Sequence, residues 1–457
     1  MTGTICCLLA FLSCLASSYF QLGLGIGFLI FWGYFFGILK ANYFDSNGLF
    51  IFDSATIGFY LGLANKIGKY SGFIGWKKIF PWFAILLAWP VFMAVVPIQH
   101  YLIQVIGLRG NIFWLPMIMI GAIINPREHK ILVYSLAVLN IVSFGFAIAE
   151  YYLGVELFVP QNDATTIVFN SNDVADGKLR IPSIFANAHS YANFMVLTIP
   201  WLLGELIATD RGRSGWLLKW FLLIGGLISA FLGVFIAGPR QPVVVLGLTG
   251  ILIFYFGRFN FLYLILIGLI GLVVGLFVAQ EERMQRFTQL QDLEAVQARI
   301  NSSLSMTFLD ILVDYPLGNG MGSGGTSLPS FAQTLLTRSI IMENEFSRIL
   351  LEQGLPGLVL FVSFFIWFVM KKLTENDAAI KTKVFVWCTS VVVISSSFIG
   401  IGLMTTVPAT AVLLLGLGFC FNSQFQTVLV NHEKVSFRSG YFNVPAYQRG
   451  LAQLDRS

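Results

Sequence analysis

Long apolar runs, separated by short charged segments, occupy almost the whole of this chain. Hydrophobic residues make up 56% of its 457 residues and charged residues only 11%, whereas soluble domains carry a charge on about a quarter of their residues. A helix that crosses a bilayer needs about 20 mostly apolar residues. The sequence therefore predicts an all-α polytopic membrane protein in which residues 1–457 form a single integral membrane domain, with no separate soluble domain.

The apolar runs predict about 12 transmembrane helices. Residues 3–39 form either one long helix or a tight pair of helices. The other runs cover 48–65, 79–97, 111–125, 131–152, 190–208, 216–237, 243–256, 261–279, 346–370, 385–404 and 405–422.

The basic residues predict which connections face the cytoplasm, because lysine and arginine are enriched in cytoplasmic loops. Most of the 28 basic residues fall in alternate connections and in the tail at 423–457, which we therefore expect to be cytoplasmic. The opposite connections include two long outer loops, 153–189 and 280–345. Arginine, whose planar fork holds phosphate bidentately, dominates the basic residues on that side: Lys40, Arg109, Lys178, Arg180, Arg240, Arg283, Arg286, Arg299, Arg338 and Arg348.

The outer loop at 280–345 has the pattern of two amphipathic helices at the membrane surface. Pro316 and a run of glycines then break the helical pattern between Asp314 and Gly325. Glycine lets backbone approach a ligand closely and can cradle phosphate, so Gly320 and Gly322 are candidate binding residues; a flexible connector is the alternative. The apolar residues at helical spacing are Leu290, Leu293, Val296, Ile300, Leu304, Phe308, Ile311 and Leu312.

Four residues at the predicted outer boundary could carry chemistry. Glu343 precedes the apolar run 346–370, where it could act as a general base or simply stabilise a helix N-terminus. Arg240 follows a Gly-Pro break between two spans, where it could bind an anion or extend to lipid headgroups. Arg180 and His189 flank a segment that re-enters the membrane, and for His189 a hydrogen-bonding role is the simpler expectation.

Four segments of the chain resemble the O-antigen ligase and polymerase family of bacterial envelope enzymes. These segments are Arg180-Ile-Pro-Ser-Ile-Phe-Ala-Asn-Ala-His189; Gly238-Pro-Arg240-Gln; Arg299 with Asp314-Tyr-Pro-Leu-Gly-Asn-Gly320; and Glu343-Asn-Glu-Phe346 with Glu352-Gln-Gly-Leu-Pro-Gly357. Glu343 stands where ligases that load lipid A core carry histidine, which favours the polymerase branch. The spacing from Arg299 to Pro316 is about two residues longer than the family pattern.

This resemblance implies an O-antigen or exopolysaccharide polymerase that joins undecaprenyl-diphosphate-linked repeat units at the outer face of the bacterial plasma membrane. It implies a metal-independent inverting glycosyltransferase without cofactors, in which Glu343 is the base and Arg240 and Arg299 stabilise the leaving diphosphate. Its expected partners are the lipid-linked donor, a glycan acceptor, membrane lipids, a flippase and a chain-length regulator, with no nucleic acid. The substrate-binding residues it implies are Arg180, His189, Asn344, Gly320 and Gly322.

Two other activities fit the same features. A ligase would transfer the finished glycan to lipid A core or another terminal acceptor. A lipid-linked oligosaccharide transporter belongs to a different class, and transporters place ionisable groups near the bilayer midplane and contain paired repeats. Asp53, Glu150 and Glu205 lie toward the ends of predicted spans, and no convincing internal repeat is present. An assembly protein without catalytic activity is a further alternative.

Overall fold

The computed structural model describes most of the chain, and every regular element in the described residues is helical. Internal contacts separate a unit Met1–Phe425 from a unit Gln426–Ser457, and the second unit lies outside the described residues. The predicted all-α class is therefore confirmed for the part described. That part comprises residues 2–43, 48–70, 72–162, 165–169, 179–209, 215–257, 297, 308–325, 328, 334–336, 340, 342, 344–373, 379–398, 400 and 406–425.

Within these residues, nine helices are long and apolar enough to cross a membrane, which is the pattern of a multi-pass membrane protein. They are α1 (Thr2–Phe20), α2 (Leu22–Asn42), α5 (Ile74–Val95), the consecutive α6 (Tyr101–Ile112) and α7 (Pro116–Gly121), α8 (Pro126–Leu153), α10 (Ala188–Ala208), α11 (Trp216–Ala237), α12 (Arg240–Gly257) and α18 (Glu345–Val369). Shorter helices of the bundle are α3 (Ile51–Ala64), α19 (Ile380–Ser396) and α20 (Ala409–Phe419). The predicted span at 261–279 lies outside the described residues, so a total of about 12 stays a prediction.

In two places the helix boundaries in the structure are more definite than, or differ from, those predicted from the sequence. The segment 3–39 is a pair of helices, because Gln21 adopts an extended conformation between α1 and α2. The span predicted at 111–125 begins earlier, at Tyr101. Polar residues interrupt the apolar run in the sequence there, but Arg109 pairs with Asp53 and Gln104 donates to backbone carbonyls. Polar groups with such partners can be buried in a helix that crosses the membrane.

Asparagine caps start three of the long helices. Asn125, Asn187 and Asn344 each accept a hydrogen bond from a backbone N–H in the first turn of α8, α10 and α18, respectively. At α8, the Glu128 side chain also accepts a hydrogen bond from the Asn125 backbone N–H, which completes a capping box. Such caps satisfy donors that a helix N-terminus would otherwise leave unpaired, and they fix where each helix begins.

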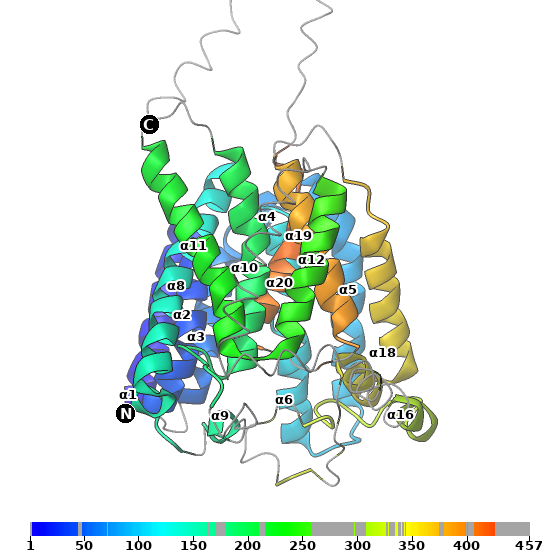
Figure 1. Cartoon of the computed structure of the whole chain (residues 1–457). Helices are drawn as coiled ribbons and strands as arrows, with labels where there is room; N and C mark the ends of the chain where they lie inside the picture. The colour runs from blue at the N-terminus through cyan, green and yellow to red at the C-terminus, as the bar shows by residue number, and fades with distance from the viewer. Residues whose placement is uncertain are drawn as a thin grey trace, which may run out of the picture. The chain divides into compact units, whose positions relative to one another are not determined.

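The helices pack side by side (Figure 1). Helix α1 packs on α3, α8 on α2 and α11, α10 on α11 and α19, and α18 on α5. At the crossing of α7 with α20, a Cβ atom on Gly121 would lie 2.0 Å from the Leu415 carbonyl oxygen and one on Gly418 would lie 1.8 Å from the Ile118 oxygen. Small residues at such positions let membrane helices approach closely.

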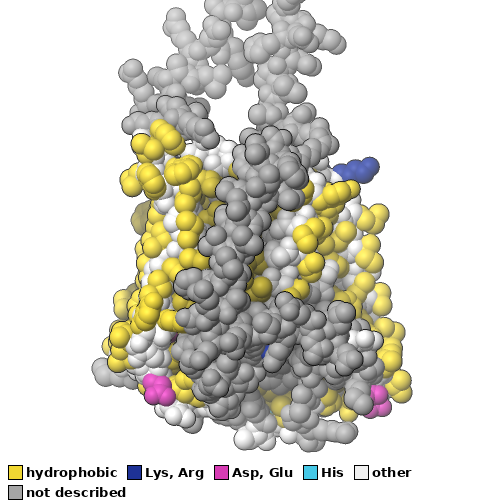
Figure 2. All heavy atoms as spheres, in the orientation of Figure 1, with side chains coloured by type: hydrophobic (Ala, Val, Ile, Leu, Met, Phe, Trp, Pro, Cys, Tyr) yellow, Lys and Arg dark blue, Asp and Glu magenta, His cyan; other side chains and the backbone are white. Residues whose placement is uncertain are grey.

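The outward surface of the long helices is apolar. Large side chains such as Phe20, Leu218 and Tyr255 are more than 70% exposed. Figure 2 shows hydrophobic side chains along the helices on one face, with the visible charged side chains toward its two ends. This distribution suits helices surrounded by lipid.

Helices α10, α12 and α18 begin at one end of the bundle, where α8, α11 and α19 end (Figure 1). We call this end the arginine end, because Arg180, Arg240 and Arg348 lie there. The loop predicted at 153–189 contributes η2 (Val155–Leu157) and α9 (Thr166–Phe169) to it.

The predicted amphipathic helices of the 280–345 loop are described only in part. Helix α16 (Phe308–Asp314) packs against α18 and buries Ile311, while Leu309 and Val313 are exposed. The helix predicted from Leu290 to Ile300 lies outside the described residues, apart from Gln297.

Candidate functional site

The segment at 180–189 brings two predicted site residues into contact. Arg180 Nη1 lies 2.6 Å from His189 Nε2. Arginine can only donate, so the histidine nitrogen accepts in this contact. Arg180 is half-buried, whereas His189 is exposed at the start of α10. The pair therefore offers guanidinium donors at the arginine end.

The Arg240 turn lies beside this pair. Gly238 ends α11 in the left-handed region, with φ 90°, and α12 begins two residues later at Arg240. A Cβ atom built on Gly238 would lie 3.9 Å from Arg180 Cγ, so the Arg180 side chain runs next to the turn. The Arg180–His189 pair and the turn that leads into Arg240 thus lie at the same end of the bundle, where α10 and α12 begin. The positive ends of these helix dipoles add to the arginine charges and favour an anion.

A chain of contacts leads from α12 to α18. Gly400 lies against the Gln241 side chain, because a Cβ atom there would be 2.4 Å from Gln241 Oε1. Ser397, at the end of α19, accepts a 3.0 Å hydrogen bond from the Glu345 backbone N–H. The first turn of α18 is therefore held at the same end of the bundle as Arg240.

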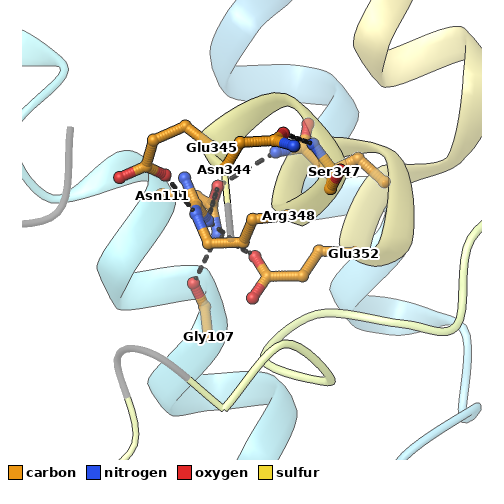
Figure 3. Close-up of polar contacts among 8 residues, drawn as sticks. Gly107, Asn111, Asn344, Glu345, Ser347, Arg348 and Glu352 are labelled. Atoms are coloured by element: carbon orange, nitrogen blue, oxygen red, sulfur yellow. Dashed lines mark hydrogen bonds and ion pairs between the residues drawn. The ribbon is translucent and has the colours of Figure 1, made fainter. Parts of the chain in front are cut away.

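The first three turns of α18 carry a buried ionic network (Figure 3). Arg348 Nε donates to Glu345 Oε2 at 2.7 Å, and Arg348 Nη1 donates to Glu352 Oε2 at 2.9 Å. Arg348 is 3% exposed, and both carboxylates are fully buried. A guanidinium between two carboxylates at positions i−3 and i+4 stabilises the charges that burial would otherwise penalise.

Asn111 connects this network to α6. Its amide nitrogen donates to Glu352 Oε2 at 2.7 Å and to the Gly107 carbonyl at 2.9 Å. Its Oδ1 accepts from Arg348 Nη1 at 3.1 Å and from Gln353 Nε2 at 3.0 Å. Because Asn111 has partners for both ends of its amide, the network fixes α6 against α18.

The glycine turn after α16 packs onto both of these helices. Gly318, Gly320, Gly322 and Gly325 all have positive φ. The Asn319 backbone N–H donates to the Leu351 carbonyl at 2.6 Å, and a Cβ atom on Gly107 of α6 would lie 2.1 Å from the Gly322 nitrogen. Gly320 and Gly322 are buried. The turn is thus a packed connector between α16 and α18 rather than a loose one, and a ligand role for its glycines stays a prediction.

Sequence reasoning missed the Asn111–Arg348 network. A signal was present on α18, because Glu345, Arg348 and Glu352 are spaced by three and four residues and share one helix face. No local pattern could identify Asn111 as their partner, since it lies 237 residues before Arg348.

Two of the predicted catalytic residues cannot be placed in the site. Glu343 and Arg299 lie outside the described residues, although Glu343 directly precedes Asn344, the fully buried cap of α18. Among the described residues, no group of three or more histidine, cysteine, aspartate or glutamate side chains could hold a metal ion.

No protein-family model and no curated protein matches this chain.

Proposed function

We propose that this protein is a membrane glycosyltransferase that polymerises glycan repeat units carried on undecaprenyl diphosphate. The observation that carries the proposal is the Arg180–His189 contact, with the Arg180 side chain beside the turn that precedes Arg240, at the end of the bundle where α10 and α12 begin. A membrane-boundary site with clustered arginine suits a substrate that has both a lipid chain and a diphosphate.

Arg240 is assigned to the leaving group. The bond between the anomeric carbon of the donor sugar and the diphosphate oxygen breaks during transfer, and negative charge develops on that oxygen. Arginine donors and helix N-termini fixed at that position stabilise this charge without reorganising. Arg180 and Arg299 assist in the same role, and His189 orients Arg180 by accepting from its Nη1.

Glu343 is assigned as the general base. It takes the proton of the acceptor hydroxyl while that oxygen attacks the anomeric carbon with inversion. Glu345, two residues later, is committed to Arg348 at 2.7 Å and is fully buried. This pairing supports Glu343 as the carboxylate of the segment that faces the substrate, while the buried Asn344 caps α18.

The resemblance also supplies the topology and the partners that we propose. The protein would have about 12 spans in the bacterial plasma membrane, with the arginine end facing the exterior and the tail at 423–457 in the cytoplasm. Its partners would be the lipid-linked donor and acceptor, a flippase and a chain-length regulator, with no cofactor.

A ligase remains the second candidate because it uses the same donor chemistry and differs only in its acceptor. A transporter is disfavoured by the placement of the buried carboxylates. Asp53 lies in the first turn of α3, and Glu150 and Glu205 lie in the last turns of α8 and α10, rather than at mid-membrane as in ion-coupled carriers.

The leaving-group role is tested by Arg240→Ala. Losing one fixed donor to the developing charge should slow elongation by about 10²-fold, measured as polymer length and rate in membranes supplied with lipid-linked repeat units. The control is Arg127→Ala, which removes an exposed arginine at the opposite end of the bundle. Normal polymer length from a folded Arg240→Ala protein would refute the role.

A deletion strain separates polymerase from ligase. Loss of a polymerase should leave single repeat units on the terminal acceptor, whereas loss of a ligase should leave full-length chains still attached to the lipid carrier. Unchanged envelope glycan in the deletion strain would contradict both assignments.

A further inference from the structure

Ser183, in the segment between Arg180 and His189, has an unusual backbone conformation. Its φ is 54°, the one non-glycine residue with positive φ in the described part of the chain. A side chain at Cβ disfavours this left-handed region, and such a residue persists only where its surroundings force the conformation.

Helix α8 supplies two of the bonds that force it. The Ser183 backbone N–H donates to Glu150 Oε2 at 2.7 Å, and Ser183 Oγ donates to the Ser143 carbonyl at 2.6 Å. Helix α2 supports the next residues, because the Ile38 N–H donates to the Ile184 carbonyl at 3.1 Å. Gly37 also leaves room for this backbone, since a Cβ atom there would lie 2.0 Å from the Phe185 carbonyl carbon.

Burying the Glu150 carboxyl group at this position is energetically unfavourable. It is fully buried, and its second oxygen, Oε1, has no hydrogen-bond partner among the described residues. A carboxylate that serves one neutral N–H in an apolar interior costs stability. Proteins accept such a cost mainly where a site needs a fixed geometry.

We propose that Glu150 is a positioning residue that holds the Ser183 turn and thereby sets the Arg180–His189 pair beside the Arg240 turn. The inference rests on the proposed function, in which Arg180 and Arg240 bind the diphosphate of the donor. Arg180 lies three residues before Ser183 and His189 six residues after it, so the turn controls where both side chains stand. Glu150 itself does not touch substrate.

Two variants separate the reach of the Glu150 side chain from its carboxyl group. Glu150→Gln keeps the length and an acceptor oxygen but replaces the carboxyl group by an amide. Glu150→Asp keeps the carboxyl group but withdraws it by about 1.5 Å, one carbon–carbon bond. Glu205→Gln and Glu205→Asp are matched controls, because Glu205 is a buried carboxylate near the far end of α10.

The first readout is hydrogen exchange of the 180–187 backbone in the full-length protein in lipid nanodiscs, which does not depend on activity. The second is the KM for undecaprenyl-diphosphate-linked repeat units, compared with kcat. Glu150→Asp should speed exchange in this segment and raise the KM by about tenfold, since a shift near 1 Å in a binding group is costly. Glu150→Gln and both Glu205 variants should stay close to wild type in both readouts.

The outcomes distinguish the inference from the proposed function. Wild-type exchange in Glu150→Asp, or equal defects in Glu150→Gln and Glu150→Asp, would overturn the positioning role. Faster exchange in Glu150→Asp without a change in KM would also overturn it. If Arg240→Ala elongates normally, the proposed function fails on its own, whatever the exchange data show.

Discussion

Arg348 is the residue whose contacts most firmly hold the start of α18. It lies between Glu345 and Glu352, and all three residues are at most 3% exposed. Removing the cation would leave two carboxylates buried without their partner, which typically costs about 3–5 kcal/mol.

We therefore expect Arg348→Ala to lower the thermal unfolding midpoint of the detergent-purified protein strongly. Exposed Arg127 provides the comparison, because its replacement by alanine should change stability by less than about 0.5 kcal/mol. Equal midpoints for the two variants would show that the network contributes little to stability.

At the level of single residues, the sequence located the charged groups but not their pairings. The motifs placed Arg180, His189 and Arg240 at the ends of apolar runs, and the structure pairs Arg180 with His189 beside the turn that precedes Arg240. Pairings such as Asn111 with Arg348, or Glu150 with Ser183, depend on how distant helices pack. No local spacing encodes such contacts, so the sequence could not predict them.

Among the helices, α18 is interrupted near its start. Gly354 has φ 70° inside the helix, and a Cβ atom there would lie 2.4 Å from the Leu317 carbonyl carbon. The Leu355 N–H beyond the break donates to the Pro316 carbonyl at 2.8 Å. The break therefore lets the glycine turn lie directly against α18.

Gly354→Ala should displace the turn from α18, because alanine adds both steric overlap and backbone strain at positive φ. We expect a lower unfolding midpoint and a loss of elongation activity, both measured on purified protein. Gly247→Ala in α12 is the matched control, because a Cβ atom there meets nothing within 4 Å. Alanine in a helix interior should leave the free energy of unfolding unchanged or raise it by up to about 1 kcal/mol. A Gly354→Ala protein as stable and active as Gly247→Ala would refute this account of the break.

Apolar runs predicted most of the long helices because bilayer thickness sets their length. The clearest shift is α6, which starts at Tyr101 rather than near residue 111. The polar side chains of α6 led the sequence analysis to predict a connecting loop before residue 111. Their hydrogen-bond partners on α3 and α18 allow the helix to include these residues.

At the scale of the whole molecule, the account requires the arginine end to face the exterior. A cysteine-free variant carrying Gln161→Cys should react with a membrane-impermeant maleimide in intact cells, since Gln161 is exposed in the 153–189 loop. Arg127→Cys, at the opposite end, should react only after permeabilisation. The reverse pattern would invert the topology and exclude an exterior active site.

Polymerisation at the arginine end is the central claim. Its most direct test is the purified protein in liposomes with undecaprenyl-diphosphate-linked repeat units and no nucleotide sugar, followed by separation of the products by length. The account predicts a ladder of elongated lipid-linked glycans from the wild-type protein and almost none from Arg240→Ala. Single repeat units that remain unjoined by the folded wild-type protein would contradict it.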